Sequence, residues 1–384
     1  MSQRTLQFVI PGSLGEATGG YHYDRRLIAG LRVLGWRVDV RSLDAGFPFP
    51  DQRALQDASE VLASIPDDEL TVVDGLALGA MPEVVANHAS RLRLVALIHH
   101  PLALETGLSP VAADQLRRSE EAALKCVRHV IVTSAFTREA LVPYGVLPEF
   151  VSVVEPGVDV SPARAPRGRV SSDVAWAGER GGGRGGGRGG ARTRGARTQM
   201  LCVATVTPRK GHEILIEALS DLRHLDWRVV CVGSTTRSPA TAEALHRQIA
   251  AAGLGDRVSV VGELDPSALE ERFAEADLFV LPTLYEGYGM VVAEALAHGL
   301  PVIATRTGAI PELVLPDAGY VVSPGDPKAF GEALSRVLTD EAVYTSLAEG
   351  AYSARERLPT WDAACKRAEE VLNAVRHKSS EGIR

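Results

Sequence analysis

Apolar and polar residues follow two different patterns along this chain, and segments with one pattern alternate with segments that have the other. Short runs rich in Val, Ile and Leu are typical of buried strands, and segments with apolar residues three or four positions apart are typical of helices. In residues 19–35, for example, Leu27, Leu31 and Leu34 fall on one helical face, and Gly35 follows as a stop. Strands that alternate with helices predict βαβ units and a parallel sheet.

The pattern occurs twice. In the first half, strands are expected at residues 6–12, 36–43, 70–76, 92–100, 128–134 and 150–157, with a clear helix at 114–127. In the second half, strands are expected at residues 200–207, 227–234, 257–264, 277–283 and 300–305, and helices at 211–222, 239–253, 266–276, from about Met290 onward, and 361–377. The expected fold is therefore α/β, with two Rossmann-like βαβ domains that face each other across a cleft. Ligands of such sheets bind beyond the carboxyl ends of the strands.

Between the two halves the pattern disappears. Residues 181–190 contain eight glycines and two arginines, and such a segment cannot bury enough apolar surface to offset the entropy of ordering it. We therefore expect a disordered linker at 161–198 between an N-terminal domain at 1–160 and a second domain at 199–360, with a C-terminal helix and tail at 361–384.

Composition narrows the class of protein. The chain has 384 residues, 45 % of them hydrophobic, a net charge of −7 and a pI of about 5.9, which suits two domains and gives no overall basic character for nucleic-acid binding. The N-terminal apolar run is too short for a signal peptide, and no run of about 18 apolar residues exists. We expect a cytoplasmic protein.

The sequence offers no obvious metal or disulfide set. Four scattered cysteines, Cys126, Cys202, Cys231 and Cys365, are interpreted as small buried hydrophobes in a reducing compartment. The histidines His22, His212 and His298 have neither ligand spacing nor clustered partners. An Asp-x-Asp pair, which can hold a metal ion against a diphosphate, does not occur in the sequence. We therefore expect a binding site without a metal ion.

The stretch EGYGMVVAEAL, residues 286–296, holds two glutamates around a glycine-rich turn. Gly287 and Gly289 separate a strand from a helix, where backbone N–H groups can approach an anion closely. Glu286 and Glu294 could then bind the two ends of an extended ligand. Alternatively, Glu294 is a helix residue stabilised by the helix dipole and Glu286 is an ordinary loop carboxylate.

Residues 277–313 closely resemble the C-terminal signature of GT-B-fold retaining glycosyltransferases of family 4, also called glycosyltransferase group 1. The positions that match are Glu286, Gly287, Tyr288, Gly289, Glu294, Ala295, Gly299, Pro301 and Val302. The resemblance implies that Glu294 binds the ribose of a sugar nucleotide and Glu286 the donor sugar. It also implies that the backbone from Gly287 through Met290 and Val291 holds the donor.

A second matching segment, TVTPRKGHEILIEAL, is similar to the phosphate-binding loop of this family. Lys210 before Gly211 could offset the charge of the leaving diphosphate. Many members carry an arginine where this chain has Thr205, so Arg209 is the candidate for the second cation. The alternative is that Arg209 and Lys210 are solvated surface charges.

The first half resembles the same family. Residues 12–21 resemble its glycine-rich first loop, and this implies that Gly19 and Gly20 lie close to the diphosphate or the acceptor. These glycines do not form the dinucleotide fingerprint of nicotinamide enzymes. A histidine at a strand end near the reacting carbon is matched by His99 or His100, with His99 the better match. Ser134 is interpreted as a helix N-cap.

We therefore expect a retaining, metal-independent glycosyltransferase with catalytic candidates His99, His100, Glu286 and Lys210. Its donor is a nucleoside diphosphate sugar, most simply of UDP or GDP, with no separate cofactor. The acceptor and the oligomeric state stay open, and peripheral membrane contact is possible. The alternatives are a phosphorylase, a sugar-nucleotide epimerase, or an RNA-associated protein that uses six arginines of the glycine-rich region, Arg180, Arg184, Arg188, Arg192, Arg194 and Arg197. The near absence of aromatic residues there argues against nucleic acid.

Overall fold

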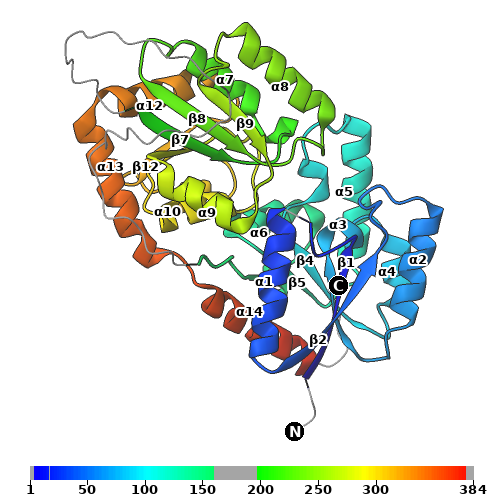
Figure 1. The fold of residues 1–384 in the computed structure, drawn as a ribbon. Helices are drawn as coiled ribbons and strands as arrows, with labels where there is room; N and C mark the ends of the chain where they lie inside the picture. The colour runs from blue at the N-terminus through cyan, green and yellow to red at the C-terminus, as the bar shows by residue number, and fades with distance from the viewer. Residues whose placement is uncertain (1–3, 17, 160–196, 378–384) are drawn as a thin grey trace, which may run out of the picture.

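A computed structural model describes residues 4–16, 18–159 and 197–377. These residues contain two six-stranded parallel sheets, each with helices packed around it (Figure 1), which confirms the expected α/β fold class. The expected linker lies outside the described residues apart from Arg197 and Thr198, and so does nearly all of the glycine–arginine run.

The first sheet has the spatial order β2-β1-β3-β4-β5-β6, and each neighbouring pair is parallel. Its strands are β1 (Arg4–Pro11), β2 (Trp36–Leu43), β3 (Leu70–Asp74), β4 (Arg93–Ile98), β5 (His129–Val132) and β6 (Val151–Val153). The helices of this part are α1 (Gly19–Val33), α2 (Gln52–Ala63), α3 (Gly75–Leu78), α4 (Pro82–His88), α5 (Pro110–Leu124) and α6 (Ala135–Ala140).

The second sheet has the order β12-β11-β10-β7-β8-β9, again parallel throughout. Its strands are β7 (Thr198–Val203), β8 (Trp227–Val232), β9 (Val258–Gly262), β10 (Leu278–Leu281), β11 (Val302–Thr305) and β12 (Gly319–Val322). Its helices are α7 (His212–Ser220), α8 (Pro239–Ala251), α9 (Pro266–Glu275), α10 (Met290–Ala297), α11 (Ile310–Leu313), α12 (Pro327–Thr339) and α13 (Glu341–Ala354).

One expected boundary was wrong. Thr198 falls inside the range expected to be disordered, but it is fully buried and pairs with Trp227 in the register of β7 and β8. The strand therefore begins at Thr198, because the neighbouring strand extends far enough to pair with it. Thr198 lies between Arg197 and Gln199, and this polar segment does not predict a buried strand residue.

The order of the second sheet creates a switch point. From the central strand β7 the chain builds outward to β8 and β9 on one side, and β10, β11 and β12 lie on the other side. The connections after β7 and β10 therefore lead away from each other. At the carboxyl ends of two such strands the loops diverge and leave room for a ligand.

The last helix, α14 (Trp361–His377), returns to the first domain and packs beside α1 (Figure 1). Its apolar side chains, which include Trp361, Ala368 and Leu372, belong to the same buried cluster as Leu27 of α1. Arg4 of β1 also forms an ion pair with Glu369. The end of the chain thus completes the core of the domain in which the chain begins.

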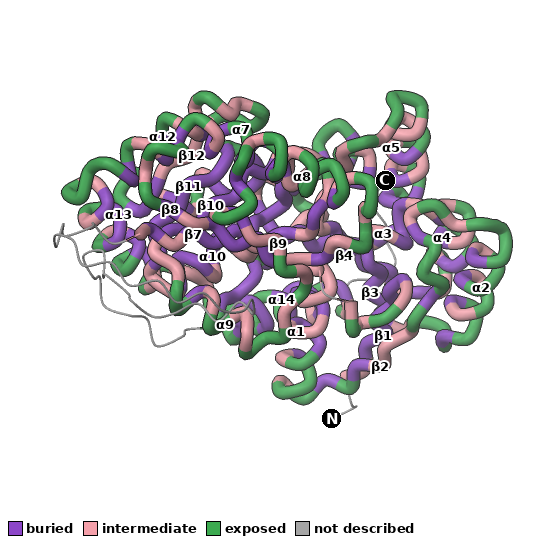
Figure 2. Tube along the Cα trace, turned by 45° about the horizontal axis from the view of Figure 1, so that its top comes forward, coloured by how far each residue is buried: buried purple, intermediate pink, exposed green. Residues whose placement is uncertain are grey.

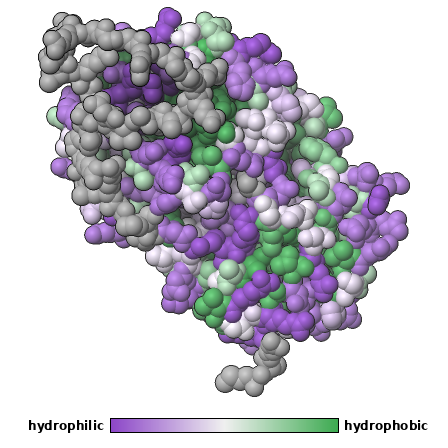
Figure 3. All heavy atoms as spheres, viewed as in Figure 1, coloured by the Kyte–Doolittle hydropathy of each residue, from purple (hydrophilic) through white to green (hydrophobic). Residues whose placement is uncertain are grey.

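Burial follows the sheets. Figure 2 shows buried residues along the strands of both sheets and exposed residues on the outer turns of the helices. On the face drawn in Figure 3, hydrophilic side chains cover most of the described surface and apolar side chains form smaller groups. Within the described ranges, no helix combines the length and apolar character needed to cross a membrane.

Candidate active site

Segments that follow the carboxyl ends of strands in the two sheets are in direct contact. Ser134, at the start of α6, donates a hydrogen bond from Oγ to the carbonyl oxygen of Gly287 over 2.8 Å. A Cβ atom added at Gly287 would overlap the carbonyl oxygen of His99, which follows β4. The glycine is therefore required for the two domains to approach this closely. The candidate residues after β4, β7 and β10 are brought to one place.

Lys210 and Glu286 form an ion pair at the switch point. Lys210 ends the 3₁₀ helix η4 (Pro208–Lys210) after β7, and Glu286 lies in the loop after β10. Arg209 Nη1 lies 3.8 Å from Glu286 Oε2, and Thr283 Oγ1 lies 3.3 Å from Glu286 Oε1. Burial opposes the charge of Glu286, but Lys210 and Arg209 outweigh it and hold the pKa of this carboxyl below its usual value.

A glycine allows the Lys210 loop to lie against the loop of β10. Gly211 has φ of 65°, a left-handed conformation that favours glycine. A Cβ atom at Gly211 would overlap the carbonyl oxygen of Pro282. Burial lowers the pKa of Lys210, and its contact with Glu286 opposes that shift. Lys210 is therefore a cation held in a largely dry environment beside one carboxylate, which contradicts the alternative of a solvated surface charge.

The start of α10 faces the start of α1. Gly289, with φ of 94°, precedes the first helical residue, Met290. A Cβ atom at Gly19, the first residue of α1, would lie 4.0 Å from Met290 Sδ. The amino-terminal ends of two helices therefore lie near each other across the domain boundary, and helix amino-termini attract anions. Tyr288 is buried beside them.

Glu294 lies one turn further along α10 and has different surroundings from Glu286. Its side chain is half-buried. Burial, followed by the nearby carboxylates of Asp159 and Glu270, raises the pKa of Glu294 to about 7. The two glutamates of the sequence motif thus differ: Glu286 is an ionised partner of two cations, and Glu294 is a carboxyl that titrates near neutral pH.

His99 lies between two buried carboxylates. Its Nε2 atom is 3.3 Å from Asp24 Oδ1 and 3.5 Å from Asp74 Oδ2. Burial alone would favour the neutral ring, but the two carboxylates raise the pKa of His99 to about 10. Gly20 leaves space for the ring, because a Cβ atom there would lie 3.2 Å from His99 Cδ2. The two carboxylates therefore favour the imidazolium form of His99.

His100 has a separate set of partners. Its Nε2 atom lies 3.3 Å from Glu105 Oε2, and Glu105 Oε1 lies 3.0 Å from Arg209 Nε. Although burial opposes it, contact with His100 and Arg209 lowers the pKa of Glu105 to about 2. Arg209 also donates a hydrogen bond to the carbonyl oxygen of Tyr285 over 2.8 Å. Glu105 thus joins the first domain to the phosphate-loop candidate of the second.

Two protein families match this chain in adjacent parts. Glycosyl transferases group 1 matches residues 191–354, and Glycosyltransferase Family 4 matches residues 22–162. The chain belongs to the GT-B glycosyltransferases of the group 1 and family 4 type. This confirms the resemblance drawn from residues 277–313 and the expected class of enzyme.

Curated relatives of this glycosyltransferase are moderately similar. An MMP α-(1→4)-mannosyltransferase from Mycolicibacterium hassiacum is 28 % identical over 77 % of this chain and 67 % of its own length. A D-inositol 3-phosphate glycosyltransferase from Xylanimonas cellulosilytica is 33 % identical over 40 % of this chain and 37 % of its own length. The second match therefore spans less than two thirds of the relative.

Solved structures share the whole fold. Sucrose-phosphate synthase from Thermosynechococcus elongatus superposes with a TM-score of 0.75 at 20 % identity and covers 96 % of this chain and 98 % of its own. HepE of Anabaena, crystallised with UDP and glucose, has a TM-score of 0.72 at 18 % identity and covers 96 % of this chain and 99 % of its own. The GT-B architecture of this glycosyltransferase is therefore plain.

Sequence reasoning missed three residues of the site, namely Asp24, Asp74 and Glu105. Asp24 lies one helical turn before Leu27 and Ile28, on the buried face of α1, and a carboxylate on an apolar face is a usable signal. Asp74 ends β3, at the edge of the sheet where ligands are expected. Glu105 lies in a loop and carried no such signal.

The expectation that His212 has no clustered partners was wrong. Its ring lies with the thiols of Cys202 and Cys231, and the ligand atoms of the three side chains lie within 4.8 Å of one another. The two cysteines are paired residues of β7 and β8, and His212 begins α7. Spacing along the chain did not reveal this group because the pairing of strands brings it together.

Proposed function

We propose that this glycosyltransferase moves a sugar from a nucleoside diphosphate sugar to an acceptor hydroxyl, retains the anomeric configuration, and needs no metal ion at the diphosphate. The observation that carries the proposal is the group of Lys210, Arg209 and Glu286 at the switch point of the second sheet. Two cations beside a helix amino-terminus suit a leaving diphosphate, whose negative charge grows in the transition state.

In this proposal the glutamates bind the two sugars of the donor. Glu294 accepts hydrogen bonds from the ribose hydroxyls, and Glu286 from hydroxyls of the transferred sugar. The donor diphosphate lies against the backbone from Gly287 to Val291 and near Gly19 and Gly20. The ion pair of Lys210 with Glu286 keeps both groups in place until the donor phosphate takes a share of the lysine charge.

The acceptor hydroxyl attacks the anomeric carbon from the face that the diphosphate leaves. The bond from that carbon to the phosphate oxygen breaks, the new glycosidic bond forms, and the acceptor proton passes to the leaving phosphate oxygen. His99, held by Asp24 and Asp74, adds fixed positive charge near this oxygen. His100, which contacts Glu105, instead positions the loop that reaches Arg209.

One argument supports a site without a divalent cation. The positive groups named above can neutralise a diphosphate by themselves. Asp24, Asp74 and His99 have ligand atoms within 4.8 Å of one another and are of types that bind metals. In this proposal they form an ion-pair group, in which the two carboxylates lie beside the imidazole of His99.

The donor base is proposed to be uracil or guanine. The similar fold of HepE, which was crystallised with UDP and glucose, supports uracil. Because one curated relative is a mannosyltransferase, donors of hexoses other than glucose are also tested. A thermal-shift screen of UDP, GDP, ADP and TDP sugars should identify one donor, since a ligand at about 100 times its dissociation constant adds roughly 2.7 kcal/mol of stability.

The activity test combines that donor with candidate acceptors and measures the nucleoside diphosphate that is released. Release of one diphosphate per glycoside formed, with the donor's anomeric configuration in the product, is expected. Conversion of the donor sugar without release of diphosphate would instead identify an epimerase. Release of a sugar phosphate from a glycoside by inorganic phosphate would identify a phosphorylase.

A further inference from the structure

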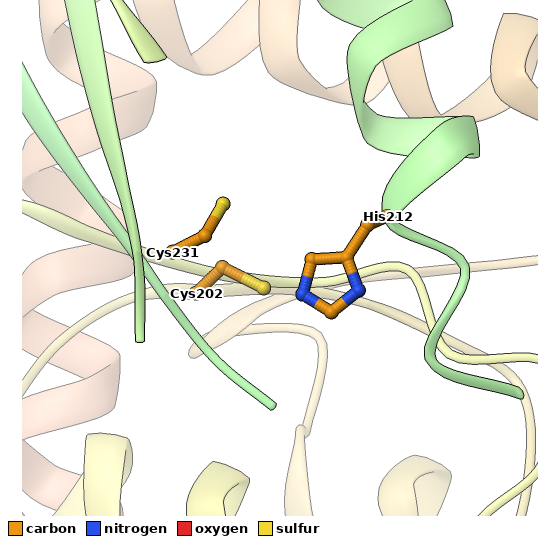
Figure 4. Close-up of side chains that lie close together, drawn as sticks. All are labelled: Cys202, His212 and Cys231. Carbon is orange, nitrogen blue, oxygen red and sulfur yellow. The ribbon is translucent and has the colours of Figure 1, made fainter. Parts of the chain in front are cut away.

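Three buried side chains inside the second domain form a compact group behind the loop that carries Arg209 and Lys210. Cys202 of β7, Cys231 of β8 and His212 of α7 are 0 %, 1 % and 1 % exposed. Figure 4 shows the sulfur of Cys202 pointing toward the imidazole of His212, with Cys231 on the neighbouring strand. The ligand atoms of the three residues lie within 4.8 Å of one another.

His212 provides the independent sign of a missing partner. Both of its ring nitrogens are buried and lack a hydrogen-bond partner. A buried polar atom without a partner costs on the order of 1–3 kcal/mol, and nearly all such atoms in folded proteins are satisfied. A neutral imidazole with an unpartnered ring nitrogen offers a lone pair, which is the form that binds a metal.

We propose that Cys202, His212 and Cys231 bind one zinc ion. Thiolates and imidazole are the ligands that zinc prefers, and its bonds of about 2.3 Å to sulfur and 2.0–2.1 Å to nitrogen place such ligand atoms about 3.5–4.0 Å apart. Since the present atoms lie within 4.8 Å of one another, small side-chain rotations bring them to the spacing of three of the four ligands of a tetrahedral zinc ion. Two thiolates with Zn²⁺ give a neutral unit, which suits a position without solvent.

The proposed zinc site would hold the loop between β7 and α7 in place. Cys202 is one of the last residues of β7, and His212 is the first residue of α7, so the intervening segment carries Arg209 and Lys210. A metal bonded to both ends of this segment would fix its length and path. The ion would thereby position the loop of the proposed phosphate site without contacting the diphosphate. The inference itself rests on the cluster and does not depend on the proposed function.

The test measures the metal content of the full chain, expressed without a polyhistidine tag and purified under reducing conditions. Mass spectrometry of the metals should find close to one zinc per chain. Cys202→Ser and His212→Ala should each retain less than half of it, and Cys126→Ser, which changes a cysteine outside the group, should retain all of it. A folded wild type that holds no zinc and takes up none from added ZnCl₂, or that holds copper instead, would overturn the proposal.

Two further measurements do not depend on whether variants fold. Cobalt exchanged into the wild type should give the absorption of thiolate-to-cobalt charge transfer, and its absence would exclude thiolate ligands. A mercurial that blocks thiols should release zinc to a colorimetric indicator in proportion to the thiols it titrates. If only two of the four thiols react in denaturant, Cys202 and Cys231 form a disulfide and the metal-site proposal is wrong.

Discussion

Ser134 donates a hydrogen bond from Oγ to the carbonyl oxygen of Gly287 over 2.8 Å, and Ser134 Oγ itself accepts a hydrogen bond from the backbone N–H of Thr137. One side chain thus caps helix α6, as the sequence predicted, and joins the first domain to the loop of the second. A cap is a local interaction and was predictable. The bond to Gly287 links residues 153 positions apart in the sequence and was not.

Ser134→Ala should weaken both functions. Loss of an N-cap costs about 1 kcal/mol, and loss of the bond to Gly287 should in addition raise the KM for the donor sugar nucleotide. The matched control is Ser109→Ala, since Ser109 caps α5 by accepting from Ala112 N and is exposed. If steady-state kinetics give equal KM values for the two variants, the bond from Ser134 to Gly287 does not contribute to donor binding.

Gly287→Ala should block the approach of the two domains. The added Cβ would overlap the carbonyl oxygen of His99, and a displacement of about 1 Å can lower a rate about 100-fold. We expect kcat/KM to fall by that order while the melting temperature changes little. Gly255→Ala, at a position where an added Cβ meets nothing within 4 Å, should behave like wild type. A fully active Gly287→Ala enzyme would contradict the contact.

Lys210→Ala should lower kcat more than it weakens donor binding. The loss of one group that stabilises developing charge costs about 10²–10³ in kcat, and Arg209 beside it should leave residual activity that the double variant lacks. The variant also leaves Glu286 buried without its nearest cation, so Lys210→Ala combined with Glu286→Gln should recover stability but not kcat. Lys328→Ala, on the exposed side of α12, is the control. Wild-type kcat in the variant without Lys210 and Arg209 would exclude the phosphate role.

Glu294 should make donor binding depend on pH. Burial and nearby carboxylates raise its pKa to about 7, so the ionised form that accepts hydrogen bonds from ribose becomes dominant only above that value. Donor affinity measured by calorimetry should increase between pH 6 and pH 8 in wild type, and Glu294→Gln should lose this increase. Glu294→Ala should raise the dissociation constant roughly tenfold or more, as expected for a hydrogen bond to a charged group of about 1.5–3 kcal/mol.

The same shift has a consequence for stability. A carboxyl whose pKa is higher in the folded state than in the unfolded chain binds its proton more tightly when folded. This contribution is fully present below the unfolded pKa, about 4.5, and is lost as the pH rises through about 7. Between pH 5 and pH 8, wild type should therefore lose more stability than Glu294→Gln in urea unfolding. Parallel curves for the two proteins would show that Glu294 does not titrate in this window.

A brief exposure to EDTA should leave most of the transferase activity intact, because the proposed diphosphate site uses Lys210, Arg209 and helix amino-termini. Added Mg²⁺ or Mn²⁺ should not raise the initial rate. The proposed zinc ion is enclosed by side chains that are at most 1 % exposed, so it should exchange slowly and survive this treatment. Rapid loss of activity on EDTA treatment, with recovery on addition of Mn²⁺ or Mg²⁺, would contradict the metal-free mechanism.

The sequence by itself determined the alternation of strands and helices, the motif around Glu286 and Glu294, and the family. These features are local, because hydrophobic periodicity, glycine turns and helix caps each depend on a few neighbouring residues. The sequence also indicated β7 and α7 on either side of Lys210. The sequence did not indicate β12, α12 and α13, which complete the second domain.

Only the tertiary structure decided which of the candidate residues meet. The order of strands in the two sheets brings Lys210 to Glu286, His99 to Asp24 and Asp74, and His212 to Cys202 and Cys231. Each group unites residues from separate strands or loops, and spacing along the chain contains no information on which parallel strands become neighbours. That choice is made by the burial of whole sheet faces and by the crossover helices that cover them.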